Sequence, residues 1–248
     1  MPLDVFGGLE PWVLGSLGLG SFIGSFMTVA LGIGGGALML AIMASLLPPA
    51  ALIPVHAVIQ LGSNLFRALI MWRHIHWPPV GAFAIGCVLG VSLGGAVAVS
   101  LPGPLVLIGV GLFVIWSVLA KPPAWLSQYP FVTGAFSSVL TMFFGATGVF
   151  VANFVKSLNM TRQRHVATHA TLMMLQHGLK IVAFGVLGFA FGPWLGVVAL
   201  MIGAGVLGTL AGRLVLEKFT DHGFKRVLDI LLVLISIRLI WQGVAGLV

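Results

Sequence analysis

The fold of this 248-residue chain is decided by one stretch, residues 32–67, which reads GIGGGALMLAIMASLLPPAALIPVHAVIQLGSNLFR. An apolar segment breaks at the glycine cluster 32–36, resumes to Leu47 and turns at Pro48-Pro49. The apolar helix predicted after this turn carries one polar stripe, because spacings of four, three, one and three residues keep side chains on one helix face. The first stripe consists of His56, Gln60, Ser63, Asn64 and Arg67.

The same pattern recurs in the second half of the chain. A weaker break at residues 144–148 is followed by another helix-forming segment. Counting 113 positions from each member of the first stripe gives a second stripe, formed by His169, Met173, Gln176, His177 and Lys180. The sequence therefore predicts a structural repeat.

Composition sets the fold class. The chain is 59% hydrophobic and only 7% charged, with several apolar runs of membrane-spanning length, so it is predicted to be an all-α polytopic membrane protein in a lipid bilayer. The formal charge of +7 comes without a basic run, which argues against nucleic acid as a partner. The single cysteine, Cys87, excludes an intramolecular disulfide and a cysteine-based metal site.

Apolar segments are predicted at 12–31, 37–47, 51–72, 79–100, 104–120, 130–144, 148–158, 165–188, 193–215 and 224–246. Segments 37–47 and 148–158 are too short to cross a hydrocarbon core of about 30 Å. Each follows a glycine-containing break, so each is predicted to be the returning half of a re-entrant hairpin.

The basic residues fix the predicted topology. If each broken hairpin enters and leaves by one face, nine basic residues fall on the same side: Arg73, Lys121, Lys156, Arg162, Arg164, Arg213, Lys218, Lys225 and Arg226. The positive-inside rule makes that side cytoplasmic and both termini periplasmic. The chain is then one transporter domain, 1–248, whose repeats, 12–120 and 130–246, are inverted. Each repeat has a broken hairpin and three transmembrane helices.

Inverted repeats with broken helices are typical of secondary transporters, whose substrate binds near the midplane. Backbone N–H groups at the starts of the half-helices suit an anion, and polar side chains of both stripes would line the space between them. No carboxylate lies on either stripe, which argues against a sodium or metal cation as cargo. The predicted substrate-binding residues are Gly34, Gly35, Gly36, His56, Gln60, Asn64, Arg67, Thr147, Gly148, His169, Gln176, His177 and Lys180.

Other interpretations remain open for these residues. The glycine breaks can serve close helix packing, the histidines and amides can bond neighbouring helices, and Arg67 and Lys180 can snorkel to the interface. The small-xxx-small pairs at 90–94 and 208–212 can pack within one subunit or between two, which allows a homodimer.

Two other functional classes are compatible with part of this pattern. The same side chains could build an anion channel. The histidines invite comparison with an intramembrane metalloenzyme, but the chain has no HExxH motif and no intramembrane carboxylate pair, so we expect neither catalytic residues nor a metal or other cofactor.

The motif Gly-Ile-Gly-Gly-Gly at 32–36, then Leu47-Pro48-Pro49, a polar helix, a turn containing Trp77 and a glycine-rich helix resembles the TauE/SafE sulfite exporter family, also called the toluene sulfonate uptake permease family. The resemblance extends over essentially the whole chain. It implies transport, with export the expected direction, of sulfite, of sulfonates such as sulfoacetate, or of related organic anions across the bacterial inner membrane.

The second half departs from the family pattern. Asn159-Met160 stands where the first repeat has Pro-Pro, and the glycine cluster is degraded. A small residue or a hydroxyl is common in the family where His56 and His169 stand. The role of these histidines therefore rests on our own inference and does not follow from the resemblance.

Overall fold

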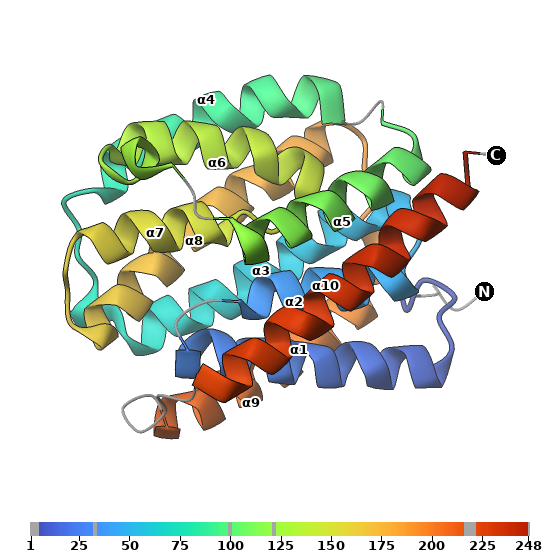
Figure 1. Ribbon diagram of the computed structural model, residues 1–248, viewed down its shortest axis with the longest axis horizontal. Coiled ribbons are helices and arrows are strands. Elements are labelled where there is room, and N and C mark those ends of the chain that lie inside the picture. The colour runs from blue at the N-terminus through green and yellow to red at the C-terminus, as the bar shows by residue number, and fades with distance from the viewer. Residues whose placement is uncertain (1–4, 32–33, 99–100, 121–122, 216–221, 248) are drawn as a thin grey trace.

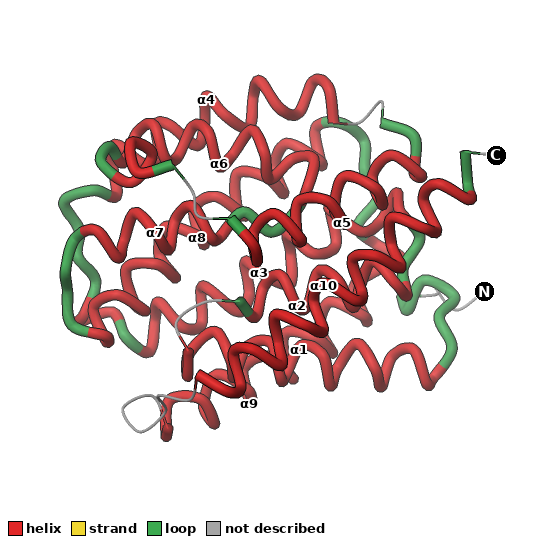
Figure 2. Tube along the Cα trace, viewed as in Figure 1, coloured by secondary structure: helices red, strands yellow, loops and turns green. Residues whose placement is uncertain are grey.

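The computed structural model describes residues 5–31, 34–98, 101–120, 123–215 and 222–247 (Figures 1 and 2). Within these ranges the regular structure is entirely helical. The α-helices are α1 (Pro11–Leu31), α2 (Gly35–Leu46), α3 (Pro49–Ile70), α4 (Val80–Ala98), α5 (Gly103–Leu119), α6 (Pro130–Phe144), α7 (Gly148–Ser157), α8 (Arg162–Val186), α9 (Leu195–Val215) and α10 (His222–Ala245). Short 3-10 turns lie at η1 (Trp72–His74), η2 (Ala124–Ser127) and η3 (Gly192–Trp194).

Each predicted apolar segment corresponds to one of these helices. Prolines begin several of them, because a proline in the first turn has no N–H to leave unpaired and its φ already suits a helix. Pro11, Pro49 and Pro130 are first residues of this kind. The α8 helix begins at Arg162, three residues before the predicted start, because its first turn is polar and lies outside the apolar run.

Two helices are half-length, as expected. α2 has 12 residues and α7 has 10, so they extend about 18 Å and about 15 Å at 1.5 Å per residue. Before each of them a glycine adopts positive φ, 101° at Gly34 and 80° at Gly145, a conformation that other residues rarely adopt. Gly32 and Ile33, which belong to the first break, lie outside the described residues.

The helices pair closely between the two halves of the chain (Figure 1). α1 packs along α9, α4 along α6, α3 along α8, and α5 along α10. A Cβ at Gly90 would collide with the Ala135 carbonyl, and a Cβ at Gly208 would collide with the Phe22 carbonyl. The small-xxx-small pairs at 90–94 and 208–212 are therefore used within the chain, to bring α4 against α6 and α9 against α1.

The two ends of the bundle differ in charge, and we name them accordingly. At the termini end, the Gly196 N–H donates to the Val5 carbonyl, and Gly246 lies against Pro104. At the opposite, basic end, Arg164 bonds His76 and Arg162 bonds the Ala30 carbonyl. The basic side chains described at this end are Arg73, Lys156, Arg162, Arg164 and Arg213.

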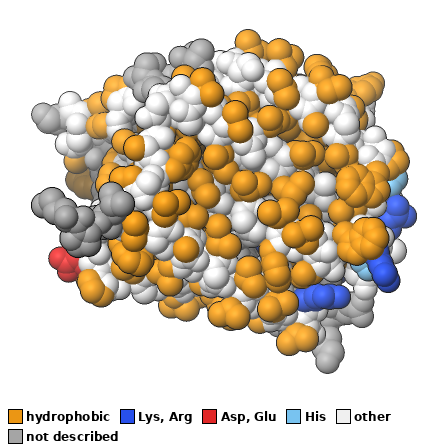
Figure 3. Space-filling model, turned by 180° about the vertical axis from the view of Figure 1, so that it is seen from behind, with side chains coloured by type: hydrophobic (Ala, Val, Ile, Leu, Met, Phe, Trp, Pro, Cys, Tyr) orange, Lys and Arg blue, Asp and Glu red, His pale blue; other side chains and the backbone are white. Residues whose placement is uncertain are grey.

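The outer surface is suited to lipid. Orange apolar side chains cover the face in Figure 3, and the Lys and Arg side chains gather at one edge. Among the described residues, three segments are long and apolar enough to cross a membrane: Pro11–Ala30, Pro49–Ile70 and Gly192–Leu214. Several shorter apolar helices accompany them, so the chain is a multi-pass membrane protein.

Candidate functional site

Both polar stripes face the interior between α3 and α8, which run antiparallel. All ten stripe members are buried, from 0% exposed at His56 and Lys180 to 8% at Gln60. Arg67 is 2% exposed. The snorkelling interpretation of Arg67 and Lys180 is therefore wrong, because both side chains end inside the protein and do not reach its surface.

One group of stripe residues lies toward the termini end, and we call it the Lys180 group. It contains Lys180 and His177 from α8 and His56 from α3. The two imidazole rings meet edge to face, with centroids 5.9 Å apart, and the charge of Lys180 acts on both. Lys180 Nζ donates to Thr141 Oγ1 at 3.3 Å and to the carbonyls of Thr141 and Gly145 at 3.4 Å. The cation is therefore held at the break between α6 and α7 by neutral oxygens.

The Arg67 group lies toward the basic end. Arg67 Nη1 donates to Asn64 Oδ1 at 2.9 Å, and Asn64 Nδ2 donates to the Gln60 carbonyl at 2.8 Å. The charge of Arg67 acts on His169 of α8. Each group thus combines the cation of one stripe with a histidine of the other stripe.

The two groups are separate positions. His56 and Arg67 are eleven residues apart on the same helix, which corresponds to about 16 Å along its axis. The antiparallel arrangement of α3 and α8 brings Lys180 beside His56 and His169 beside Arg67. The predicted site residues therefore do not converge on one point but lie along a path between the two ends.

Matched histidine contacts join each stripe to the half-helix of its own repeat. His56 Nε2 lies 3.4 Å from the Gly36 carbonyl, and His169 Nε2 lies 3.3 Å from the Gly148 carbonyl. Because a carbonyl only accepts, the proton in each contact belongs to the histidine nitrogen. These contacts tie each half-helix to the helix that carries the stripe of the same repeat.

The glycines predicted to bind substrate have different surroundings. A Cβ at Gly35 would collide with the Gly24 carbonyl, so Gly35 permits close packing of α2 on α1. A Cβ at Gly36 would lie 2.5 Å from Gln60 Nε2, so this glycine adjoins the first stripe. Gly148 is less crowded, with Met173 Cε the nearest atom at 3.5 Å.

Sequence reasoning missed the contribution of α6. Gln176 Nε2 donates to Ser137 Oγ at 2.7 Å and to Ser138 Oγ at 3.0 Å, and Thr147 Oγ1 donates to Gln176 Oε1 at 3.4 Å. Thr141 belongs to the same helix and holds Lys180. Residues 137, 138 and 141 share one helix face, so their spacing was a signal that could have identified them.

The interior retains unused hydrogen-bonding capacity. A buried polar atom without a partner costs about 1–3 kcal/mol, so such atoms are uncommon in native proteins. Several occur here: His56 Nδ1, both ring nitrogens of His177, Ser63 Oγ and Arg67 Nε. These five atoms lie on the same stripes as the two buried cations, as expected of a ligand site, while two others among the described residues, Thr209 Oγ1 and Ser236 Oγ, lie on α9 and α10.

The ionisable side chains of the site are all basic. Neither stripe carries a carboxylate, and the described carboxylates are Glu10, before α1, and Asp229, on α10. The guanidinium and ammonium groups can only donate hydrogen bonds, and anions are their usual partners. In the part of the chain that the structure describes, no group of three His, Cys, Asp or Glu side chains is placed to hold a metal.

Comparison with known proteins places this architecture in a family. No curated protein and no solved structure matches the chain significantly. The profile of the family described as "Sulfite exporter TauE/SafE" matches residues 17–239, which includes all ten α-helices at least in part. The chain belongs to the sulfite exporter TauE/SafE family of membrane transporters.

Proposed function

We propose that this protein is a secondary transporter of sulfite or of an organosulfonate anion such as sulfoacetate. One observation carries the proposal: Arg67 and Lys180 are buried among apolar helices, and their hydrogen bonds go to neutral oxygens. Burying a charge without a counter-charge is costly, and intramembrane ionisable groups usually mark a transport pathway. A bound anion would supply the missing negative charge.

The anion would occupy two successive positions. The Lys180 group offers an ammonium and the free nitrogens of His177, and the Arg67 group offers a guanidinium and the Asn64 amide. Both positions lie where α3 meets α8, so an anion passing between the two ends meets a cation twice. Sulfite and sulfonates suit such positions because several oxygens can each accept a hydrogen bond.

The transporter domain would consist of two inverted repeats, residues 12–120 and 130–246, that rock to give alternating access. The helix pairing supports this arrangement. α1 packs with α9 as α6 packs with α4, while α3 packs with α8 and α5 with α10. A two-fold axis that exchanges the halves would produce these four pairs.

The basic end would face the cytoplasm of a bacterial inner membrane, with both termini periplasmic. Arg73, Lys156, Arg162, Arg164 and Arg213 support this orientation through the positive-inside rule. Export is the direction that the family description favours.

Purified protein in proteoliposomes tests this function. Sulfite and sulfoacetate should show saturable uptake and counterflow exchange, and Lys180→Met should abolish both. Arg213→Met removes an exposed cation at the basic end and serves as the control, with transport retained. Flux that neither saturates nor exchanges would indicate an anion channel, and absence of flux with every sulfur anion would contradict the proposed cargo.

A further inference from the structure

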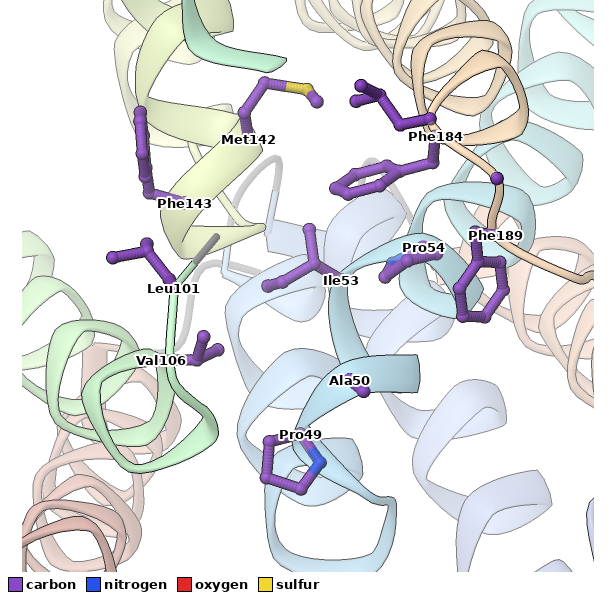
Figure 4. Close-up of a pocket in the computed structure, with 12 residues that line it drawn as sticks. Pro49, Ala50, Ile53, Pro54, Leu101, Val106, Met142, Phe143, Phe184 and Phe189 are labelled. Carbon is purple, nitrogen blue, oxygen red and sulfur yellow. The ribbon is translucent and has the colours of Figure 1, made fainter. Parts of the chain in front are cut away.

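A cavity of about 280 Å³ opens at the termini end (Figure 4). It lies among the start of α3, the connection before α5, the end of α6 and the end of α8. Among the described residues, those that line it are apolar apart from one glycine. Figure 4 shows Ile53, Met142 and Phe184 converging on its inner part. The volume exceeds the roughly 150 Å³ that accommodates benzene in a protein core, so the carbon body of an organosulfonate would fit.

The inner wall of the cavity adjoins the Lys180 group. Phe184 lies one helical turn beyond Lys180, Ile53 lies one turn before His56, and Met142 directly follows Thr141, which holds Lys180. Ile53, Met142 and Phe184 are 1–7% exposed. These three apolar side chains therefore separate the cavity from the first buried cation.

The corresponding positions at the basic end are also apolar. The residues compared are Ile53, Pro54, Met142 and Phe184, all of which line the cavity. Their counterparts, 113 positions away in the other half, are Val166, Ala167, Val29 and Met71. These counterparts are together the buried members of one hydrophobic cluster, separate from the main core.

The two ends differ in how these equivalent residues pack. At the basic end Val29, Val166 and Met71 belong to one packed hydrophobic cluster and are 0–4% exposed. Ile75 packs against them, whereas its counterpart at the termini end is Gly188, which has open space where a Cβ would lie. The same positions therefore line a cavity at one end and form a packed plug at the other.

We propose that these residues are the paired gates of the transport path. The termini-side gate consists of Ile53, Met142 and Phe184. The basic-side gate consists of Val29, Met71, Val166 and Ala167. This inference rests on the proposed transport function and adds its access route. The cavity is the vestibule that leads the anion to the termini-side gate, and this gate covers the Lys180 group. The structure is the state whose vestibule lies at the termini end.

Apolar constrictions suit this role because they exclude water and ions when closed. Each gate lies one turn outside a cation: Phe184 follows Lys180, and Met71 follows Arg67. Rocking of the repeats would pack the termini-side gate and open an equivalent vestibule at the basic end, so the two gates exchange their present arrangements.

Matched single cysteines test the proposal. Cys87, the native cysteine, is buried and is first replaced by alanine. Phe184→Cys and Met71→Cys are then compared for their rates of reaction with a membrane-impermeant thiol reagent in detergent, without anion. If the basic-side vestibule opens only in a minor state of about 10% or less, Met71→Cys should react about tenfold more slowly or slower still.

The pair Ile53→Cys and Val166→Cys provides a second comparison if either first variant fails to fold. A cross-link between cysteines at positions 71 and 166 should form readily and stop transport, and reduction should restore it. The cysteine-free parent controls for the reagents. Equal reaction rates at the two ends, or normal transport with positions 71 and 166 cross-linked, would overturn the gates.

Failure of the gates can be distinguished from failure of the proposed function by measuring anion binding to the same variants. Equal labelling at the two ends with intact sulfite or sulfonate binding would contradict the proposed gates but not the proposed transport function. Faster labelling at the termini end in a protein that binds none of these anions would support the gates and contradict the proposed cargo.

Discussion

The two polar stripes occupy equivalent positions but hold their cations differently. Lys180 of the second stripe reaches across to α6 and bonds the break at Thr141 and Gly145. Arg67 of the first stripe bonds Asn64, three residues earlier on its own helix. The 113-residue spacing therefore places a cation at the same position of each stripe, while the neighbouring residues decide which helix each cation is bonded to.

The different bonding of Lys180 and Arg67 affects how anion binding would couple to helix movement. A cation tied to α6 links the second stripe to a broken hairpin, so an anion that draws Lys180 away would break its bonds to Thr141 and Gly145. The Gly145 carbonyl would then be held by Thr141 Oγ1 alone. Arg67 can change partners without disturbing another helix in this way. The Lys180 group is accordingly the position where anion binding should couple most strongly to helix movement.

The largest expected effect is on anion affinity. Lys180→Met and Arg67→Met should each weaken sulfite or sulfonate binding by about 2–5 kcal/mol, because each removes one partner of a buried charge interaction. The unliganded proteins should remain folded, since replacing an uncompensated buried charge by an apolar side chain is often neutral or stabilising. Calorimetric titration measures the first quantity and thermal unfolding the second. Unchanged anion affinity in both variants would show that Arg67 and Lys180 do not bind the anion.

A glycine pair at equivalent positions should give opposite results for folding. Gly35→Ala places a Cβ against the Gly24 carbonyl, and such overpacking should cost about 1–3 kcal/mol of the free energy of unfolding or more. Gly148→Ala has ordinary contact distances to Met173 and should be tolerated. Thermal unfolding in detergent checks both. If the two variants unfold at the same temperature, the close packing of α2 on α1 does not need the glycine.

Ser63 and Gln176 also occupy equivalent positions in the two halves. Replacing them should give a smaller difference in the free energy of unfolding. Gln176→Ala removes the partner of Ser137, Ser138 and Thr147 and should cost about 1–3 kcal/mol. Ser63→Ala removes a hydroxyl that has no partner and should change the unfolding temperature little. A larger loss in Ser63→Ala than in Gln176→Ala would contradict this assignment of the hydrogen bonds.

Much of the fold follows from local signals in the sequence. Paired prolines and glycine breaks locate the helix ends because their effects on backbone conformation are local. The 3.6-residue periodicity of the polar residues is visible in the sequence and predicts both stripes. All ten stripe members are buried. The family resemblance is confirmed over residues 17–239.

The partners of these residues could not be found in the same way. That Lys180 bonds α6 while Arg67 bonds its own helix depends on how the helices approach one another, which the helix pattern does not encode. The cavity likewise lies among four segments that are far apart in sequence. The expectation of a single meeting point for the stripes missed the antiparallel offset that separates the Lys180 and Arg67 groups.

The central claim is that the two buried cations bind a sulfur-containing anion. Its most direct test is thermal stabilisation of the purified protein by sulfite, sulfate, sulfoacetate, taurine, an aromatic sulfonate and acetate. A ligand at a hundredfold excess over its Kd stabilises the folded state by about 2.7 kcal/mol. We predict a clear rise in Tm with sulfite or a sulfonate, and none with the same anion in the double variant Arg67→Met, Lys180→Met. No rise with any anion, or an equal rise in the double variant, would contradict the claim.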